Sequence, residues 1–257
     1  MKKFYLFLTI LFCFTSACLV QAQNDSIYLW KSGQLTFRQS IKTTDLDSIT
    51  FKIKFPTVQI CSQVWTKSNL NLDVATYSDG TPIPQVTDAN TWNNSRTGMW
   101  CYYNNNVGPT GVVGAYGAVY GKLYNWYAVA GIYDLASLNN ASLRKKLAPI
   151  GWHIPTDAEW TILTTCLGGE IGAGIKMKEA GTSHWSSQSG PYVGNNSSGF
   201  TALPSNPVEA TKAEFWSTDE YSVINAWTRV LYATSANVTR NNSCTKNSKC
   251  SVRCIKD

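Results

Sequence analysis

The chain has 257 residues, of which 15% are charged and 44% are hydrophobic, and its formal net charge is +6. An average globular domain contains about 25% charged residues, and here Asn, Ser and Thr replace much of the missing surface charge. The basic residues are scattered apart from Arg144-Lys145-Lys146, which we interpret as a solvated helix end. The composition excludes a nucleic-acid-binding protein, which needs a basic stripe, and favours an exported, β-rich protein.

Residues 1–22 have the layout of a secretory signal peptide. Two lysines precede an apolar run over residues 4–14, and small residues follow it. Val20-Gln21-Ala22 suits cleavage by ordinary signal peptidase, whereas Thr15-Ser16-Ala17-Cys18 is a degraded lipoprotein signal in which Cys18 would be lipidated. No later apolar stretch is long enough to span a bilayer. We therefore expect an exported chain, at the cell surface or extracellular, that meets a membrane only through a lipid at Cys18.

Residues 23–56 are predicted to form a short β leader before the main domain. Strands are expected over 26–30 and 35–37, with Gly33 between them. Residues 46–53 alternate apolar and polar side chains, as a half-buried strand does, and Pro56 ends the segment.

Residues 57–257 are predicted to form one compact domain. In its first half the pattern predicts a strand pair over 58–65 and a long polar surface excursion over 76–98. A buried apolar segment follows over 123–129, and then a helix over 135–147 that Pro149 ends. Two later apolar-polar alternations, over 226–232 and 251–255, predict strands.

The clearest helix signal lies at Thr156. Its hydroxyl can cap the free backbone N–H groups, and Glu159 can reach back to the N–H of the cap residue, which is a capping box. Trp160, Leu163 and Leu167 then share one helix face, and Gly168-Gly169 ends the helix.

Six cysteines lie beyond the predicted signal peptide, namely Cys61, Cys101, Cys166, Cys244, Cys250 and Cys254. An exported protein meets an oxidising compartment, so we interpret these cysteines as structural. Six cysteines allow 15 full pairings, and the sequence does not choose among them. The spacing near the C-terminus lacks the second close pair and the nearby His of a zinc site.

Six blocks of sequence, in order, resemble the Fibrobacter succinogenes major paralogous domain, over roughly residues 57–257. They are Trp100-Cys101-Tyr102-Tyr103-Asn104-Asn105, Tyr120-Gly121-Lys122-Leu123-Tyr124-Asn125-Trp126, residues 148–160 (APIGWHIPTDAEW), Ser198-Gly199-Phe200-Thr201-Ala202-Leu203-Pro204, Phe215-Trp216-Ser217-Thr218 and Ser251-Val252-Arg253-Cys254. The Gly151–Trp160 block also resembles the formylglycine-generating, sulfatase-modifying enzymes. The resemblance implies an α+β, C-type-lectin-like domain with two helices, small twisted antiparallel sheets and long loops.

The sequence departs from the family pattern at four places. Ala148 stands where the family often has Cys, Lys249-Cys250 stands where it usually has Gly-Phe, and Phe215-Trp216 replaces a double Trp. The loop after Leu203-Pro204 is short. These changes leave the expected fold intact but affect disulfide pairing and the shape of the binding face.

We predict no catalytic activity. His153 lies in the Gly-Trp block and is interpreted as structural, and His184 as a surface residue. Asp157 and Glu159 are two apart on a helix, so they do not converge on one substrate atom, and helix capping explains them better. The resemblance to formylglycine-generating enzymes leaves an enzyme with a cysteine pair as an alternative, although the segment between Cys244 and Cys250 does not match that family's active segment.

The predicted ligand-binding residues lie in the C-terminal region, where aromatic side chains alternate with amides and hydroxyls, as in adaptable paratopes. They are Tyr221, Asn225, Trp227, Thr228, Tyr232, Thr234, Ser235, Asn237, Thr239, Asn241, Asn242, Thr245 and Asn247. The alternative is a polar sheet face with Asn-rich turns.

The function predicted from these residues is recognition of a glycan or a surface protein by an exported module. The resemblance adds that diversity-generating retroelements randomise Asn-type codons in such domains. The sugar-binding calcium motifs of lectins, Glu-Pro-Asn or Gln-Pro-Asp followed by Trp-Asn-Asp, do not occur. No cofactor is expected, although loop oxygens could bind a structural calcium ion. A structural or adhesive surface component is the remaining alternative.

Overall fold

The computed structural model describes residues 7–8, 20–22, 26–31, 34–40, 55–72, 75–103, 115–185 and 189–257. The chain divides into two compact units, residues 1–52 and 53–257. No helix within these described ranges is both long and apolar enough to cross a bilayer.

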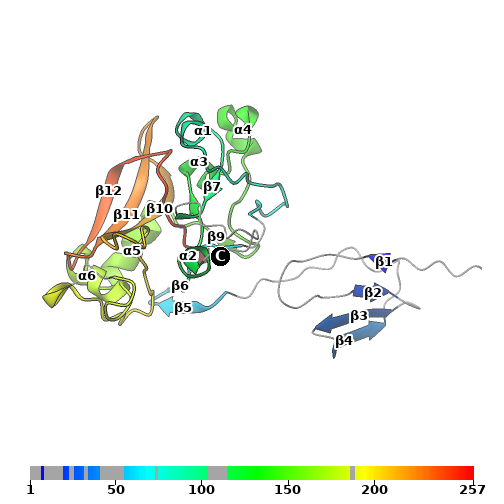
Figure 1. The fold of residues 1–257 in the computed structure, drawn as a ribbon, viewed down its shortest axis with the longest axis horizontal. Coiled ribbons are helices and arrows are strands. Elements are labelled where there is room, and N and C mark those ends of the chain that lie inside the picture. The colour runs from blue at the N-terminus through cyan, green and yellow to red at the C-terminus, as the bar shows by residue number, and fades with distance from the viewer. Residues whose placement is uncertain are drawn as a thin grey trace, which may run out of the picture. The chain divides into compact units, whose positions relative to one another are not determined.

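The first unit contains one antiparallel sheet in the order β1-β2-β3-β4 (Figure 1). The strands are β1 (Phe7–Leu8), β2 (Val20–Ala22), β3 (Ser26–Lys31) and β4 (Gln34–Ser40). The predicted strands over 26–30 and 35–37 are thereby confirmed. The strand predicted over 46–53 lies outside the described residues.

The second unit combines helices with small antiparallel sheets, which confirms the α+β class. Its strands are β5 (Thr57–Ile60), β6 (Gln63–Thr66), β7 (Trp100–Cys101), β8 (Leu123–Tyr124), β9 (Trp152–His153), β10 (Lys212–Glu220), β11 (Asn225–Tyr232), β12 (Val238–Thr245) and β13 (Ile255–Lys256). Its α-helices are α1 (Ala89–Asn94), α2 (Ala115–Tyr120), α3 (Trp126–Val129), α4 (Leu135–Asn139), α5 (Asp157–Cys166) and α6 (Glu170–Met177). In the described part of the chain α5, with 10 residues, is the one long continuous helix, whereas α6 is kinked at Ile171 and Gly172, whose backbone angles are not helical.

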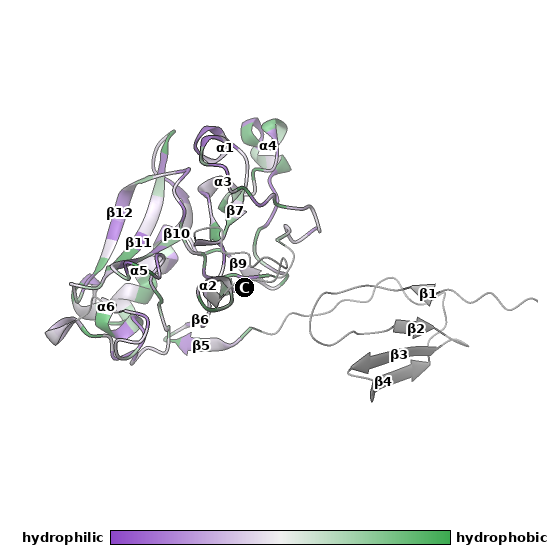
Figure 2. Cartoon of the chain, in the orientation of Figure 1, coloured by the Kyte–Doolittle hydropathy of each residue, from purple (hydrophilic) through white to green (hydrophobic). Residues whose placement is uncertain are grey.

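The sheet with the longest strands in this unit has the order β10-β11-β12 and is covered on both faces. Ala213, Phe215 and Leu231 pack on one face in the same core cluster as Trp160 and Leu163 of α5, and α5 and α6 lie beside this sheet (Figure 1). On the opposite face, Trp216, Ala226 and Cys244 join a second core cluster. The outer strand β12 is largely hydrophilic (Figure 2).

The start of α5 follows the sequence prediction closely. Thr156 Oγ1 accepts a hydrogen bond from the N–H of Glu159 at 3.1 Å, and the Glu159 carboxylate accepts the N–H of Thr156 at 2.8 Å. Both halves of the capping box are therefore present. Trp160 and Leu163 are buried and Leu167 packs at the edge of the same cluster, as their spacing predicted.

The helix predicted over 135–147 is shorter in the structure and broken in two. α4 ends at Asn139, and a separate 3₁₀ turn covers Ala141–Leu143. Asn140 interrupts the helix because it has extended backbone angles, and its side chain caps the next turn by accepting the N–H of Ser142 at 3.0 Å. Asn competes in this way with helical hydrogen bonding.

The other large sheet joins the beginning and the end of the unit, in the order β5-β6-β13-β9. The strand predicted over 251–255 is reduced to Ile255–Lys256, and Ser251 forms an isolated bridge with Phe215. A disulfide joins Cys61, just after β5, to Cys166 at the end of α5.

Arg253 shows what the Ser-Val-Arg-Cys block does. Its guanidinium is buried and donates to Asn69 Oδ1 at 2.7 Å and to the carbonyls of Thr66, Phe200 and Thr201 at 2.7, 2.9 and 2.9 Å. Burial lowers its pKa to about 9. The residue fastens the C-terminal segment to two distant parts of the chain through hydrogen bonds that each involve a charged donor.

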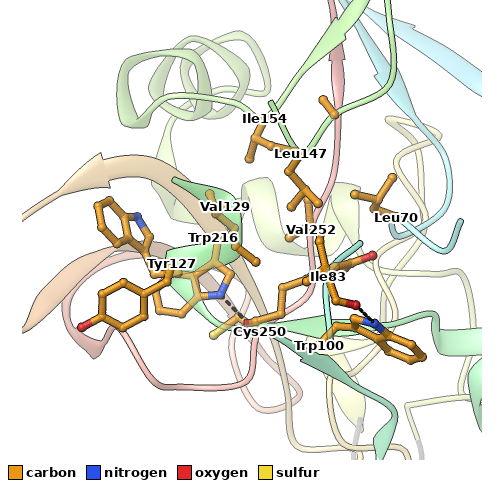
Figure 3. Close-up of a cluster of buried hydrophobic side chains, with 14 of the residues drawn as sticks. Leu70, Ile83, Trp100, Tyr127, Val129, Leu147, Ile154, Trp216, Cys250 and Val252 are labelled. Atoms are coloured by element: carbon orange, nitrogen blue, oxygen red, sulfur yellow. Dashed lines mark hydrogen bonds between the residues drawn. The ribbon is translucent and has the colours of Figure 1, made fainter. Parts of the chain in front are cut away.

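The second core cluster is rich in aromatic side chains (Figure 3). The indole N–H of Trp100 donates to the carbonyl of Ile83 at 2.9 Å, and that of Trp216 to the carbonyl of Tyr124 at 2.8 Å. Buried Trp needs such a partner for its one polar atom. This cluster supports the loops that form the site described next.

Candidate functional site

The thirteen predicted ligand-binding residues do not share one exposed face. Tyr221, Tyr232, Thr234, Asn237, Thr239 and Thr245 are exposed, Asn225, Trp227, Ser235, Asn241, Asn242 and Asn247 are half-buried, and Thr228 has no exposed surface. The physical reason is that both faces of the β10-β11-β12 sheet carry packing, so alternate residues point into different environments. The thirteen residues therefore do not form one outward-pointing surface, and binding by the exposed members stays a prediction.

Part of the set lies on the α5 face of the sheet. The Arg240 guanidinium stacks 3.7 Å from the centre of the Trp227 ring, and the rings of Tyr221 and Trp227 are 5.0 Å apart. Arg240 also pairs with Asp157 at 2.7 Å. Trp227 is thus held by neighbours on this face.

Thr228 and Asn241, on the opposite face, are engaged in an internal network around Glu214. The buried Glu214 carboxylate accepts from the Thr228 hydroxyl at 3.1 Å and from the Asn241 amide at 3.3 Å, and it pairs with Lys212 at 2.7 Å. A buried carboxylate requires such partners. These polar side chains stabilise the sheet and are not free to meet a ligand.

The strongest candidate for a binding site is a groove of about 800 Å³ at the end of the sheet where β10 and β12 finish. Its walls come from five separate parts of the chain, with the lining residues Asn93, Asn94, Ser95, Arg96, Trp126, Tyr127, Ile132, Leu138, Asn139, Arg144, Glu220, Val223, Ile224, Thr245, Lys246 and Asn247. We call this the loop-end groove. Two of the predicted residues, Thr245 and Asn247, line it.

Lys246 locks two walls of the loop-end groove together. The residue is 5% exposed, its ammonium donates to the Val223 carbonyl at 2.8 Å and pairs with the Glu220 carboxylate, and it lies 4.7 Å from the centre of the Trp126 ring. Its backbone N–H also donates to the Ile224 carbonyl at 2.9 Å. The groove therefore has one fixed wall rather than loose loops.

Asn247 links a third segment to this wall. Its amide donates to the Asn93 carbonyl, and its own carbonyl accepts the indole N–H of Trp92. Its side-chain oxygen is buried and has no hydrogen-bond partner within the described parts of the chain. An unsatisfied buried acceptor of this kind is costly.

The loop-end groove is positively charged. Arg96, Arg144 and Lys246 face one carboxylate, Glu220, which Lys246 already pairs. In the described structure no carboxylate lies within ion-pair distance of Arg96 or Arg144. Burial raises the pKa of Tyr127, against the opposing influence of Arg96.

A smaller groove of about 460 Å³ lies on the other side of the 245–249 loop, and Glu214 lines it. Cys244 and Cys250 are buried beside Glu214, with their sulfurs 3.7 Å apart. The two sulfurs and one carboxylate oxygen of Glu214 lie within 4.8 Å of one another, and two sulfurs with one oxygen suit a soft metal ion better than calcium. Burial, followed by the hydrogen bond to Cys244, raises the pKa of Cys250, which opposes thiolate nucleophilicity.

Both histidines are bound to carboxylates. His153 Nδ1 lies 2.7 Å from Asp257 and Nε2 lies 2.8 Å from Glu159. His184 Nδ1 lies 2.8 Å from Glu179. His153 thus joins the end of the chain to the start of α5, which is a structural role.

Sequence reasoning missed most of the loop-end groove. Arg96 and Asn139 lie in segments that were interpreted as surface excursion and helix, and Arg144 in a run interpreted as a solvated helix end. The paired amides of Asn93 and Asn94 would have suggested a loop, whereas the structure places them in the last turn of α1, so they gave no usable signal either. Glu214 carried no signal, since an isolated Glu is expected to be exposed to solvent, and the strand that holds it, β10, was not predicted.

The chain was compared with known families, curated proteins and solved structures. The Fibrobacter succinogenes major domain (Fib_succ_major) matches residues 58–256. No curated protein and no solved structure matches the chain.

Proposed function

The chain belongs to the Fibrobacter succinogenes major domain family, and we propose that this member is a non-catalytic binding module, exported to the cell surface or secreted, that recognises a glycan. A protein ligand on another surface is the second outcome of the same proposal. We propose with it that the α+β unit is a C-type-lectin-like variant, for which the sequence blocks over 57–257 are the support.

The loop-end groove is the observation that carries this proposal. Its volume of about 800 Å³ lies within the range of about 300–1,000 Å³ that is usual for small-ligand sites. Asn94, Asn139 and Thr245 are exposed and supply amide and hydroxyl groups, while Tyr127 adds an aromatic ring. Amides and hydroxyls can exchange hydrogen bonds with sugar hydroxyls, and aromatic rings provide rigid area.

The charge of the groove favours a glycan that carries carboxylate or sulfate groups. Arg96 is exposed and Arg144 is half-buried, and neither guanidinium has a carboxylate partner among the residues described. A guanidinium binds a planar anion through two parallel hydrogen bonds. An acidic sugar would supply the counter-charge that the protein itself does not.

Export is supported by the N-terminal sequence and by cysteine usage. Residues 1–22 have the pattern of a signal peptide, with a lipid at Cys18 as the alternative anchoring mode. The Cys61–Cys166 disulfide fits an oxidising compartment.

We propose that the protein is not catalytic because the histidines and the cysteines that could act in a reaction are either paired or buried. Each histidine is held by a carboxylate, and burial keeps the pKa of Cys250 above its usual range. The close approach of Cys244 and Cys250 is nevertheless the observation that favours an enzyme resembling the formylglycine-generating family as a second candidate. An oxygen-dependent oxidation of a cysteine peptide by the purified protein would decide for that candidate.

Two further elements of the proposal have simple tests. Diversification by a retroelement predicts a reverse transcriptase gene and a template repeat near the gene that encodes this chain. A genomic neighbourhood that lacks both would contradict diversification. A structural or adhesive component would assemble with partner chains and would show no affinity for small ligands.

The direct experiment is a glycan-array screen of the exported protein, labelled at its N-terminus. We expect binding to oligosaccharides with carboxylate or sulfate groups and weaker binding to their neutral counterparts, with a strong decrease at high salt. An array with no bound glycan, tested together with a cell-surface protein screen that gives a ligand, would move the proposal to its protein form. Failure of both screens would contradict it.

A further inference from the structure

We propose that Cys244 and Cys250 are joined in the exported protein by a disulfide that closes the 245–249 loop and fixes the shared wall of the two grooves. This inference concerns a modification site and does not depend on which ligand the loop-end groove binds.

The fold places the sulfur atoms of Cys244 and Cys250 close together. Cys244 pairs with Ala226 one residue before β12 ends at Thr245, the chain then turns, and Cys250 forms an isolated bridge with Tyr124. The two sulfurs are 3.7 Å apart and both residues are buried. A disulfide requires a sulfur–sulfur distance of about 2.05 Å, so the two sulfurs need to approach each other by about 1.7 Å.

The loop between the two cysteines forms a wall of both grooves. Thr245, Lys246 and Asn247 line the loop-end groove, and Asn247, Ser248 and Lys249 line the smaller one. Within the loop, the N–H of Ser248 donates to the Thr245 carbonyl at 2.8 Å, and the two hydroxyls are 3.0 Å apart. A covalent link at the two ends of this turn would keep Lys246 and Asn247 in their groove-forming positions.

The chemistry is a two-electron oxidation with a disulfide as oxidant. The thiolate of one cysteine attacks a sulfur of an oxidising protein disulfide, a thiol of that protein leaves, and the second cysteine displaces the other thiol. One sulfur–sulfur bond forms in this chain, one breaks in the oxidant, and the two protons end on the oxidant's thiols. Burial holds the pKa of Cys250 well above its usual range, so the exchange belongs to the folding stage, and the finished bond should resist reductants in the native protein.

A metal ion is the competing occupant, and the surroundings disfavour it. The third available ligand is Glu214, whose oxygens already accept from Thr228, Asn241 and Lys212. The Lys212 ammonium lies 2.7 Å from that carboxylate, where it would repel a cation. The thiol pair alone does not make a closed four-ligand zinc site.

Differential alkylation of the exported protein tests the proposal directly. The protein is denatured without reductant, alkylated, reduced, alkylated with a second reagent and digested for mass spectrometry. We expect the second label on both Cys244 and Cys250 and a linked peptide in the unreduced digest, with Cys101 and Cys254 carrying the first label. The first label on both Cys244 and Cys250 would overturn the inference, and so would a link from either of them to a different cysteine. First-label modification of the pair that appears only after a zinc chelator is added would also overturn it, because it would show that a metal ion holds the two thiols.

A second measurement tests the role of the link in fixing the loop. Trypsin cleavage after Lys249, which is exposed, is compared between the wild type and a variant carrying Cys244→Ala and Cys250→Ala. We expect cleavage to be about tenfold faster in the variant, because the open loop regains chain entropy, and unchanged in the control Cys101→Ala. Equal cleavage rates in all three proteins would show that the loop is fixed without the bond.

Discussion

Asp157 offers the sharpest test of how this fold is held together. The sequence assigns Asp157 to the capped start of α5, but in the structure its carboxylate pairs with two arginines of the adjacent sheet, Arg229 and Arg240. Arg229 is fully buried and donates to the Asp157 carboxylate at 2.5 Å and, through its other terminal nitrogen, to the Asp157 carbonyl and the Thr161 hydroxyl at 2.9 Å each. The change Asp157→Ala removes the only carboxylate paired with this buried cation in the described part of the chain.

The magnitude follows from what remains after the substitution. Removing one partner of a buried ion pair costs about 3–5 kcal/mol, because it leaves an uncompensated buried charge. Arg229 keeps the Asp157 carbonyl and Thr161 as acceptors, so we expect the lower end, a loss of about 3 kcal/mol in the free energy of unfolding. Arg240 has a side chain that is 43% exposed, and Arg240→Ala should cost at most about 1 kcal/mol, as exposed pairs do.

The assay is urea unfolding of the disulfide-intact protein at neutral pH, followed by tryptophan fluorescence, for the wild type and both variants. Trp160 is buried next to this site and reports on the loss of packing. A loss of under about 1 kcal/mol in the free energy of unfolding for Asp157→Ala, equal to that for Arg240→Ala, would refute the reasoning, because an unpaired buried arginine should destabilise the fold by more than this. The hydrogen bonds from Arg240 and Arg229 outweigh burial and lower the pKa of Asp157. The stabilisation should therefore be present above the carboxyl's ordinary pKa of about 3.9 and disappear as the pH falls through the lowered value.

Two further predictions concern stability. Replacing Cys61 and Cys166 together by Ala opens a link between residues 105 apart in sequence and should cost about 3–4 kcal/mol in urea unfolding; a loss below about 1 kcal/mol would contradict a structural role. The hydrogen bonds of His153 with Asp257 and Glu159 outweigh the lowering by burial and raise its pKa. Its contribution is thus full below about pH 6.5 and lost as pH rises through the raised pKa. His153→Gln should therefore cost up to about 1 kcal/mol at pH 5.5 and little at pH 9, whereas an equal cost at both would be inconsistent with an ionic contact.

Local signals in the sequence predicted several elements well. The Thr156 capping box predicted the start of α5, because its partners are three residues apart and need no tertiary context. The alternation over 226–232 predicted β11 to within one residue. Both signals depend on short-range geometry, which a sequence displays directly.

Features that depend on tertiary packing could not be predicted in this way. Thr228 alternates like a surface residue, yet it is buried because the second core cluster covers that face of the sheet. The loop-end groove assembles from segments between positions 93 and 247. Arg96 lay in a predicted surface excursion and Arg144 in a predicted helix, and neither pattern indicates which other segment of the chain a residue meets, so the two arginines appeared unrelated.

The central claim is that the loop-end groove binds an acidic glycan, and calorimetric titration of one oligosaccharide into three proteins tests it most directly. The ligand is the acidic oligosaccharide with the strongest array signal, and the proteins are the wild type, Arg96→Ala in the groove and Arg240→Ala on the α5 face of the sheet. We predict that Arg96→Ala weakens binding by at least about tenfold, since a charge-assisted hydrogen bond contributes about 1.5–3 kcal/mol, and that Arg240→Ala retains the wild-type affinity. Wild-type affinity in Arg96→Ala together with lost binding in Arg240→Ala would contradict the account and place the ligand at Trp227.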